Sequence, residues 1–305
     1  MPPTASRRQL KEFIVSATTI QRETNPVPDG EFVFTWADFR QIAAMVHGEA
    51  GIVLAESKAN LVYSRLAKRL RAIGLRSFRE YCELIAGEEG VGERQSMIAA
   101  MTTNVTRFFR EQHHFDHLAQ SVLPRLAAAA RRGQRVRIWS SACSSGEEPY
   151  SIALTLLNAM PDAPKHDVLI LASDIDPDIL DMAAEGSYAL SKLEHIPPAM
   201  RGNLVVTDRA AQRFHFADPV RGLIRFRNLN LLRDWPIRGS LDVIFCRNVM
   251  IYFDQETQDA IWARFAERMT PEGTLYIGHS ERIATDRLPF VLTAQTTYRS
   301  DGKRT

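Results

Sequence analysis

Apolar residues between Thr35 and about Arg110 recur at intervals of three and four, a spacing typical of amphipathic helices. Thr35 fits the N-cap of a first helix, with Asp38 at the acidic third position. We expect further helices at residues 56–73, 77–86 and 92–102. No alternating strand pattern interrupts this region, so we predict a small all-helical domain.

The pattern changes after Ala130, where short apolar runs alternate with helical segments. Strands are predicted at 135–139, 168–172, 241–246, 274–278 and 290–299, and helices at 148–160, from Pro177 onward and at 255–269. The runs VLILA and LDVIFC are continuously apolar, as in strands buried on both faces. The alternation predicts an α/β domain with a parallel sheet covered by helices on both sides.

Residues 187–222 break this alternation, because short β-like pieces lie there among turns and no long helix is predicted. We interpret the segment as a small β-subdomain inserted in the α/β domain. The predicted organisation is therefore a flexible N-terminal arm at 1–28, a helical domain at 29–110 and an α/β domain at 111–305.

Composition excludes several classes of protein. The 305 residues carry a net charge of +2, with 45% hydrophobic and 24% charged residues. No apolar run reaches the roughly 20 residues that a membrane-spanning helix needs, and no secretory signal is expected. Three cysteines lie far apart without a CxxC pair, which argues against a disulfide framework or a zinc site. We expect a cytoplasmic monomer with no membrane insertion and no nucleic-acid partner.

Polar residues follow the predicted strands, at the sheet edge where α/β proteins bind ligands. The turn SSACSSG after the first strand has small residues but neither the GxGxxG pattern nor the P-loop lysine. Asp174 directly follows the second strand, where a carboxylate can accept two hydrogen bonds from a ribose diol. Asp176 is better suited to capping the helix that Pro177 opens. NAD and S-adenosylmethionine both remain open at this point.

Two further clusters are harder to explain by packing. Arg247 and Asn248 follow the buried strand LDVIFC, with Tyr252 shortly after them. The second cluster is the segment TTNVTRFFR, in which packing can explain the two phenylalanines but not the polar side chains of Asn104, Thr106 and Arg110.

Six motifs in order, TTNVTRFFR, SACSSGEEPYSIA, ASDID, FRNLNL, IFCRNVMIYFD and LYIGHSE, resemble the chemotaxis receptor methyltransferase (CheR) family over residues 34–298. The resemblance implies a helical domain followed by a class I S-adenosylmethionine-dependent methyltransferase (Rossmann-like) domain with an inserted β-subdomain. It also implies methylation of glutamate side chains on the cytoplasmic region of a methyl-accepting chemotaxis receptor, with S-adenosylhomocysteine as product. The cofactor-binding residues it implies are Asn104, Thr106, Arg110, Glu147 (or Glu148), Asp174, Asn230, Leu231, Arg247 and Asn248.

The chemistry fits this set of groups. A glutamate side chain with a pKa near 4.3 is already ionised at neutral pH, so its attack on a sulfonium methyl needs no general base. Alignment and partial removal of water are what the site must supply. We expect Arg110 to hold the incoming carboxylate, and Tyr252, which the resemblance implies to lie near the methyl, to orient either reactant.

A basic helix gives a candidate docking surface. Arg65, Lys68 and Arg69 follow the i, i+3, i+4 spacing of one helix face. This face is either simply solvated or, as the resemblance suggests, binds the acidic methylation region of the receptor. The segment 197–221 has no Gly-x-Gly loop of the kind with which some family members hold a receptor peptide, so we do not expect such tethering here.

Other functions fit the sequence less well. A nucleic-acid base methyltransferase usually has prolines after the fourth strand, which RNVM lacks. A non-catalytic module that senses S-adenosylmethionine would not require Arg110 and Tyr252, and an NAD dehydrogenase would require the glycine pattern. His113 and His117 have the spacing of a helical metal pair, but no HExxH glutamate accompanies them, so we expect structural histidines and no metal.

Overall fold

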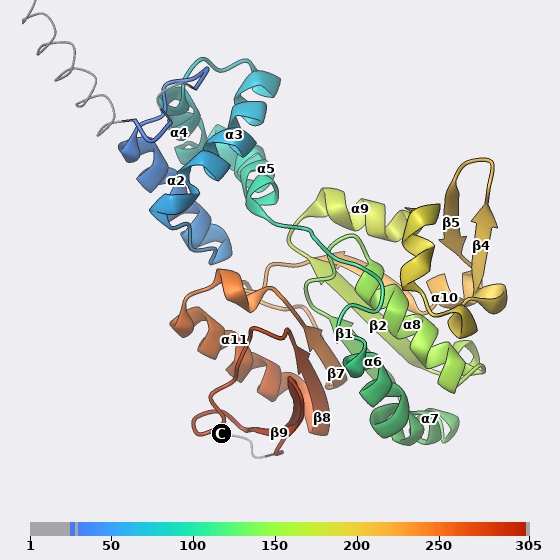
Figure 1. Cartoon of the computed structure of the whole chain (residues 1–305). Coiled ribbons are helices and arrows are strands. Elements are labelled where there is room, and N and C mark those ends of the chain that lie inside the picture. The colour runs from blue at the N-terminus through green and yellow to red at the C-terminus, as the bar shows by residue number, and fades with distance from the viewer. Residues whose placement is uncertain (1–24, 28–29, 303–305) are drawn as a thin grey trace, which may run out of the picture. The chain divides into compact units, whose positions relative to one another are not determined.

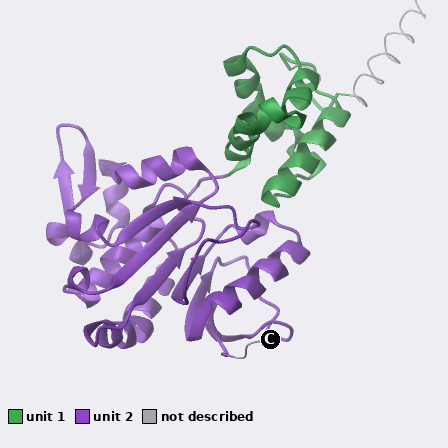
Figure 2. Cartoon of the chain, turned by 180° about the vertical axis from the view of Figure 1, so that it is seen from behind, with its two compact units in different colours: residues 1–102 green, residues 103–305 purple. Residues whose placement is uncertain are grey.

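The computed structural model describes residues 25–27 and 30–302, so the arm predicted at 1–28 lies almost entirely outside the described residues. The chain divides into two compact units, Met1–Thr102 and Thr103–Thr305 (Figure 2). Each unit has its own hydrophobic core.

The first unit is helical throughout its described residues, as the sequence predicts. Its helices are α2 (Trp36–Ala50), α3 (Ala59–Ile73), α4 (Phe78–Ala86) and α5 (Val91–Met101), with 3-10 turns at Glu56–Lys58 and Glu88–Gly90. Thr35 caps α2 in a capping box with Asp38, which confirms the predicted start of the first helix. Inside the unit the ring of Phe34 packs on that of Phe78, with centroids 4.4 Å apart.

The second unit is built on a seven-stranded sheet in the order β6-β2-β1-β7-β8-β10-β9 (Figure 1). Its strands are β1 (Val136–Ser140), β2 (Val168–Asp174), β6 (Ile224–Asn228), β7 (Leu241–Cys246), β8 (Met269–Ile277), β9 (Phe290–Ala294) and β10 (Thr297–Ser300). The five strands from β6 to β8 pair in parallel. The predicted α/β fold class is therefore confirmed.

The far edge of this sheet differs from the prediction. The single strand expected at 290–299 is a hairpin of two strands, and β10 runs antiparallel to both β8 and β9. Thr296 between them has a φ of 47°, a left-handed conformation that reverses the chain. The sequence there contains neither glycine nor proline, so no turn residue marked the reversal.

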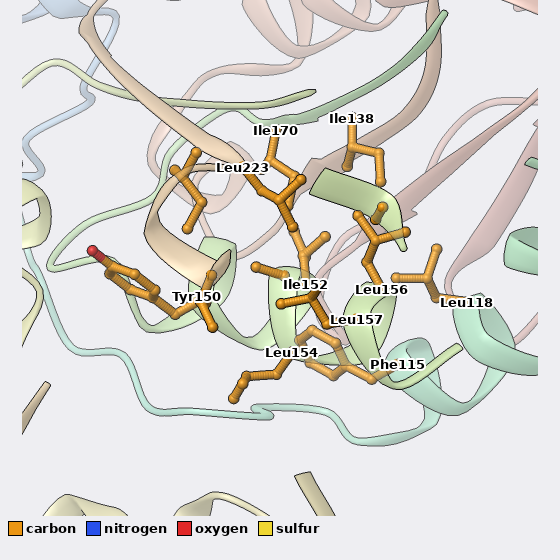
Figure 3. Packing of buried hydrophobic residues seen from close by; sticks show 14 of the residues in the cluster. Phe115, Leu118, Ile138, Tyr150, Ile152, Leu154, Leu156, Leu157, Ile170 and Leu223 are labelled. Carbon is orange, nitrogen blue, oxygen red and sulfur yellow. The ribbon is translucent and has the colours of Figure 1, made fainter. Parts of the chain in front are cut away.

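Helices cover both faces of the sheet. They are α6 (His113–His117), α7 (Leu123–Arg131), α8 (Glu147–Ala159), α9 (Pro177–Glu185), α10 (Asp218–Arg221) and α11 (Gln255–Arg268), with short helical turns at Leu118–Val122, Ala163–Lys165, Leu190–His195, Pro198–Met200, Gly202–Leu204 and Met250–Tyr252. Ile138 of β1 packs with Ile152 and Leu156 of α8 (Figure 3). Its neighbour Trp139 meets Phe265 of α11, because successive strand residues point to opposite faces. Within the described part of the chain, no helix combines the length and apolar character needed to span a bilayer.

A second, three-stranded sheet forms the predicted β-subdomain. It consists of β3 (Ser187–Ala189), β4 (Val205–Asp208) and β5 (Arg213–Phe216), in the antiparallel order β3-β5-β4. Phe216 stacks on Tyr150 of α8 with ring centroids 4.2 Å apart, and Phe214 packs against Phe108 at 5.8 Å. The subdomain therefore shares the core of the α/β unit and also contacts the segment that carries Asn104 and Arg110.

Candidate functional site

The candidate site lies at the carboxyl ends of the central strands. Chain order reverses between β1 and β7, since β2 follows β1 on one side and β8 follows β7 on the other. Ligands of open α/β sheets bind beyond the strand ends at such a point. The predicted residues that follow β1, β2, β6 and β7 therefore belong to one edge of the sheet.

The loop after β1 is bent sharply around the edge of the sheet. Ser144 has a φ of 49° and Gly146 a φ of 95°, both in the left-handed region. A Cβ on Gly146 would lie 2.7 Å from the hydroxyl of Tyr188 and 2.9 Å from Cβ of Ala183, so only glycine fits there. Its small residues let the loop pass close to the end of β2, where the N–H of Cys143 donates to the carbonyl of Ser173 at 2.9 Å.

Asp174 occupies the end of β2, as the sequence predicts. Its carboxylate accepts the N–H groups of Ser144 at 2.8 Å and Asp176 at 3.1 Å. Burial raises the pKa of Asp174, although these main-chain donors oppose the shift. A carboxylate has about four acceptor positions, so two donors leave capacity for a diol.

The segment from Asn104 to Arg110 is bound to this same edge. The Asn104 amide donates to Asp176 at 3.1 Å, and the Ser144 hydroxyl donates to the Asn104 carbonyl at 3.2 Å. Asp176 also accepts the N–H of Asp178, which confirms its predicted helix cap. Thr106 is half-buried on the same segment. The structure thus brings Asn104 beside the loop that holds Asp174.

Arg247 forms the β7 side of the site. Its guanidinium, with a side chain only 2% exposed, donates to Glu148 at 2.9 Å and lies 3.4 Å from the carboxylate of Glu111. It also donates to the main-chain carbonyl of Arg110. Burial raises the pKa of Glu148, an effect that the charge of Arg247 opposes. One buried cation therefore joins α8, the end of β7 and the residues Arg110 and Glu111 before α6.

The two adjacent acids predicted as alternatives, Glu147 and Glu148, have different partners. Glu148 accepts from the Ser140 hydroxyl at 2.7 Å as well as from Arg247. Glu147 accepts from Lys192 at 2.6 Å through Oε1 and from the Ser145 hydroxyl at 2.6 Å through Oε2. Glu147 therefore faces the β-subdomain, whereas Glu148 faces the strand ends.

Glu281 is a buried acid of this edge that sequence analysis did not identify. Its carboxylate accepts the N–H groups of Val249 at 2.9 Å, Met250 at 2.8 Å and Gly278, and so ties the end of β7 to the end of β8. Asn248, with a φ of 59°, lies in the loop it holds. Glu281 is the last residue of the motif LYIGHSE, so its position shortly after a buried strand could have identified it.

A Glu281→Gln variant is expected to lose about 1–3 kcal/mol of unfolding free energy. In wild type both carboxylate oxygens accept main-chain N–H groups, whereas in the variant the amide NH₂, itself a donor, would face one of them. Urea denaturation measures the loss. Glu272→Gln, a change at an exposed position on β8, is the control and should leave the midpoint nearly unchanged. Equal midpoints for all three proteins would contradict the assigned role.

Glu111 and the histidines form a cluster next to Arg247. His114 is fully buried, and burial together with the nearby Arg247 lowers its pKa to about 3, so it is neutral at pH 7. It contacts the Thr296 hydroxyl at 2.8 Å, while His117 contacts that of Tyr276 at 2.9 Å. Burial raises the pKa of Glu111, a residue that sequence analysis missed, but the charge of Arg247 is the main cause that lowers it overall.

A metal ion has one candidate set of ligands among the described residues. Atoms of Glu111, His113 and His114 lie within 4.8 Å of one another, whereas the spacing argument pointed to His113 and His117. The guanidinium of Arg247 at 3.4 Å from Glu111 opposes a cation at this position. His114 and His117 contact the hydroxyls of Thr296 and Tyr276 instead.

The remaining predicted site residues lie around the same edge. Asn230 and Leu231 follow β6, where the N–H of Leu229 bonds to the carbonyl of Asp174 at 2.9 Å. Tyr252 is half-buried in the helical turn after β7. The Arg110 guanidinium donates to the Val105 carbonyl at 2.9 Å within its own segment.

The basic residues of α3 differ from the expected open face. Arg65 donates to the carbonyls of Ala100 at 3.1 Å and Thr102 at 2.7 Å, at the end of α5. Arg69 forms two hydrogen bonds to Glu93, at 3.0 and 2.6 Å. Lys68 is exposed. Two of the three cations therefore stabilise the helical unit itself, because long side chains of a helix flank can reach neighbouring helices.

Comparison with known proteins agrees with the two-unit organisation. Residues 37–102 match the family described as CheR methyltransferase, all-alpha domain, and residues 104–299 match CheR methyltransferase, SAM binding domain. A probable chemotaxis protein methyltransferase of Rhizobium etli is 52% identical, with 85% of this chain and 98% of that protein covered. Chemotaxis protein methyltransferase 2 of Pseudomonas aeruginosa is 46% identical (82% and 88% covered), and the chemotaxis protein methyltransferase of Salmonella typhimurium is 42% identical (86% and 89% covered). The chain therefore belongs to the CheR methyltransferase family and is an S-adenosylmethionine-dependent methyltransferase.

Proposed function

We propose that this enzyme transfers a methyl group from S-adenosylmethionine to glutamate side chains in the cytoplasmic region of a chemotaxis receptor, giving glutamate methyl esters. The observation that carries the proposal is that Asp174 and Asn104, from distant parts of the sequence, belong to one hydrogen-bonded edge of the sheet in a chain of the CheR family. Because its substrate region is cytoplasmic, the enzyme works in the cytoplasm.

The groups at this edge suit the cofactor. S-adenosylmethionine supplies a methyl group on a positively charged sulfur. Asp174 has acceptor capacity for the ribose diol, and Asn230 and Leu231 flank the adenine from the loop after β6. Thr106, Arg247 and Asn248 complete the binding set with Asn104 and Arg110. We leave Glu147 out of this set, because its side chain is fully buried and its carboxylate faces Lys192 and Ser145 on the side of the β-subdomain.

The acceptor carboxylate requires alignment more than activation. Its oxygen forms the new bond to the methyl carbon while the carbon–sulfur bond breaks and its electron pair returns to sulfur, giving S-adenosylhomocysteine. No proton is transferred, since the glutamate is already ionised. Arg110 holds the carboxylate in line, and the Tyr252 hydroxyl orients either reactant from the β7 side.

Lys68 is the residue of α3 that we propose to contact the receptor, because its side chain is exposed. Arg65 and Arg69 instead form hydrogen bonds within the helical unit. Lys68→Glu is expected to lower receptor methylation severalfold at low ionic strength, and the difference should shrink as salt rises. Lys165→Glu, an equal charge change at an exposed lysine of the second unit, should leave the rate unchanged. The same rate for Lys68→Glu and wild type at low salt would eliminate this docking surface.

Methyl-transfer assays test the proposed substrate. The enzyme is incubated with isotope-labelled S-adenosylmethionine and, in parallel, with a receptor cytoplasmic fragment, tRNA and duplex DNA. We expect label on the receptor alone, released as methanol by mild base and located by mass spectrometry on glutamates. Label on tRNA or DNA would instead support a base methyltransferase, and binding of the cofactor without transfer to any acceptor would support a sensor.

A further inference from the structure

Two polar side chains of the β-subdomain contact the loop after β1 and the start of α8. Tyr188, in β3, donates from its hydroxyl to the carbonyl of Ser145 at 2.7 Å. Lys192, in the helical turn that follows, donates to Glu147 at 2.6 Å, at the start of α8. Its ammonium also lies 5.7 Å from the centre of the Tyr188 ring. Both contacts end on residues next to Gly146, where the chain has a left-handed φ of 95°.

The two side chains of the Lys192–Glu147 ion pair differ in burial. The side chain of Glu147 is fully buried, whereas that of Lys192 is 42% exposed. A buried carboxylate without a cationic partner is strongly destabilising, while a half-exposed lysine can be solvated by water. The conformation of the first turn of α8 therefore depends on Lys192 more than Lys192 depends on Glu147.

The first turn of α8 is also tied to the segment Asn104–Arg110. The Ser151 hydroxyl donates to the carbonyl of Glu147 at 2.6 Å and accepts the N–H of Phe109 at 3.0 Å. Phe108, the preceding residue, packs edge-on against Tyr188 with ring centroids 4.9 Å apart. One connected set of contacts thus runs from the β-subdomain through Glu147 to the segment before Arg110.

We propose that Lys192 is a positioning residue for the cofactor, which acts from the β-subdomain by holding Glu147 and thereby the loop Ser141–Gly146. The inference deepens the proposed function and rests on the cofactor's binding at this loop. Glu147 is then a link between subdomain and loop and makes no direct contact with the cofactor. Because linkage is reciprocal, a bound cofactor also stabilises the subdomain.

Titration calorimetry with S-adenosylhomocysteine tests the proposal on the full chain. Lys192→Met is expected to weaken binding about tenfold, a typical size for coupling between linked elements. Lys192→Arg should stay near wild type, because it keeps the cation. Lys165→Met, at an exposed lysine away from the subdomain, is the matched control and should bind as wild type does. Circular dichroism at the titration temperature establishes that each variant is folded.

The double variant Lys192→Met/Glu147→Gln separates this role from direct binding. With Glu147 neutral, removal of Lys192 no longer leaves a buried charge unpaired, so the double variant should bind more tightly than Lys192→Met. If Glu147 instead held the cofactor itself, the double variant would bind no better than the single one. Unchanged binding by folded Lys192→Met would also overturn the proposal, whereas failure of wild type to bind would contradict the proposed function.

Hydrogen exchange gives a second readout that does not depend on a variant. S-adenosylhomocysteine bound to the wild-type enzyme should slow amide exchange in β3 and in the turn Leu190–His195, in addition to the loop after β1. Exchange that slows only in the loop, with the subdomain unaffected, would contradict the coupling.

Discussion

An Arg110→Ala enzyme is expected to methylate its receptor about 100-fold more slowly at saturating cofactor, a loss typical of removing one donor from a developing or reacting anion. Its affinity for S-adenosylhomocysteine should fall far less than its turnover, because Arg110 is one of several groups in the cofactor-binding set. The reason is geometric: Asp174 and the loop after β1 hold the cofactor, whereas the Arg110 guanidinium donates to the Val105 carbonyl within its own segment and can turn to an incoming carboxylate.

Two variants make the Arg110 prediction specific. Arg110→Lys keeps the charge but loses the planar fork, so it should recover only part of the lost kcat. Arg107→Ala, at an exposed arginine three residues earlier, should methylate at the wild-type rate. Initial rates with labelled cofactor, together with calorimetry, give kcat and affinity separately. Wild-type turnover by Arg110→Ala would refute the role of this residue.

Arg247→Met is expected to lower the free energy of unfolding by about 3–5 kcal/mol, the usual effect of leaving buried acids without their cation. Arg247 is the common partner of Glu148 and Glu111 and also lies over the ring of Phe115, 5.8 Å from its centre. Methionine fills a similar volume, so the lost charge and hydrogen bonds account for most of the expected decrease in stability. Arg299→Met, at an exposed arginine of β10 paired with Glu272, should change stability far less.

The unfolding free energy that the Arg247→Met variant loses should depend on pH. In wild type the charge of Arg247 lowers the pKa of Glu111 and opposes the rise that burial causes at Glu148. Without it both carboxyl pKa values rise in the folded state, so the folded state binds protons more tightly than the unfolded chain. Stability of the variant relative to wild type then increases as pH falls. Urea denaturation at pH 7.5 and 5.5 measures this, and a deficit that grows at low pH would contradict the assignment.

Most of the architecture could be predicted because the chain marks its elements locally. Thr35 and Asp38 form a capping box three residues apart, and VLILA is long and apolar enough to be a buried strand. The hairpin at β9 and β10 was missed because Thr296 adopts its positive φ without a glycine to signal it. Strand β6, Ile224–Asn228, was likewise missed, since its alternating arginines resemble a solvated segment.

The site was predictable in its residues but less so in their partners. Asp174 stands at the end of its strand, so its place at the sheet edge could be inferred from chain order alone. The partner of Glu147 could not be inferred in this way, because Lys192 is 45 residues away and belongs to the inserted subdomain. Glu281 is separated from the Val249 N–H by 32 residues. Contacts between distant segments depend on tertiary packing, which local patterns do not specify.

Titration calorimetry of the wild-type chain with S-adenosylhomocysteine, and separately with NAD, is the most direct test of a cofactor site at this sheet edge. We predict saturable uptake of one S-adenosylhomocysteine per chain and no heat from NAD. Material that is folded by circular dichroism yet takes up no S-adenosylhomocysteine would contradict the account.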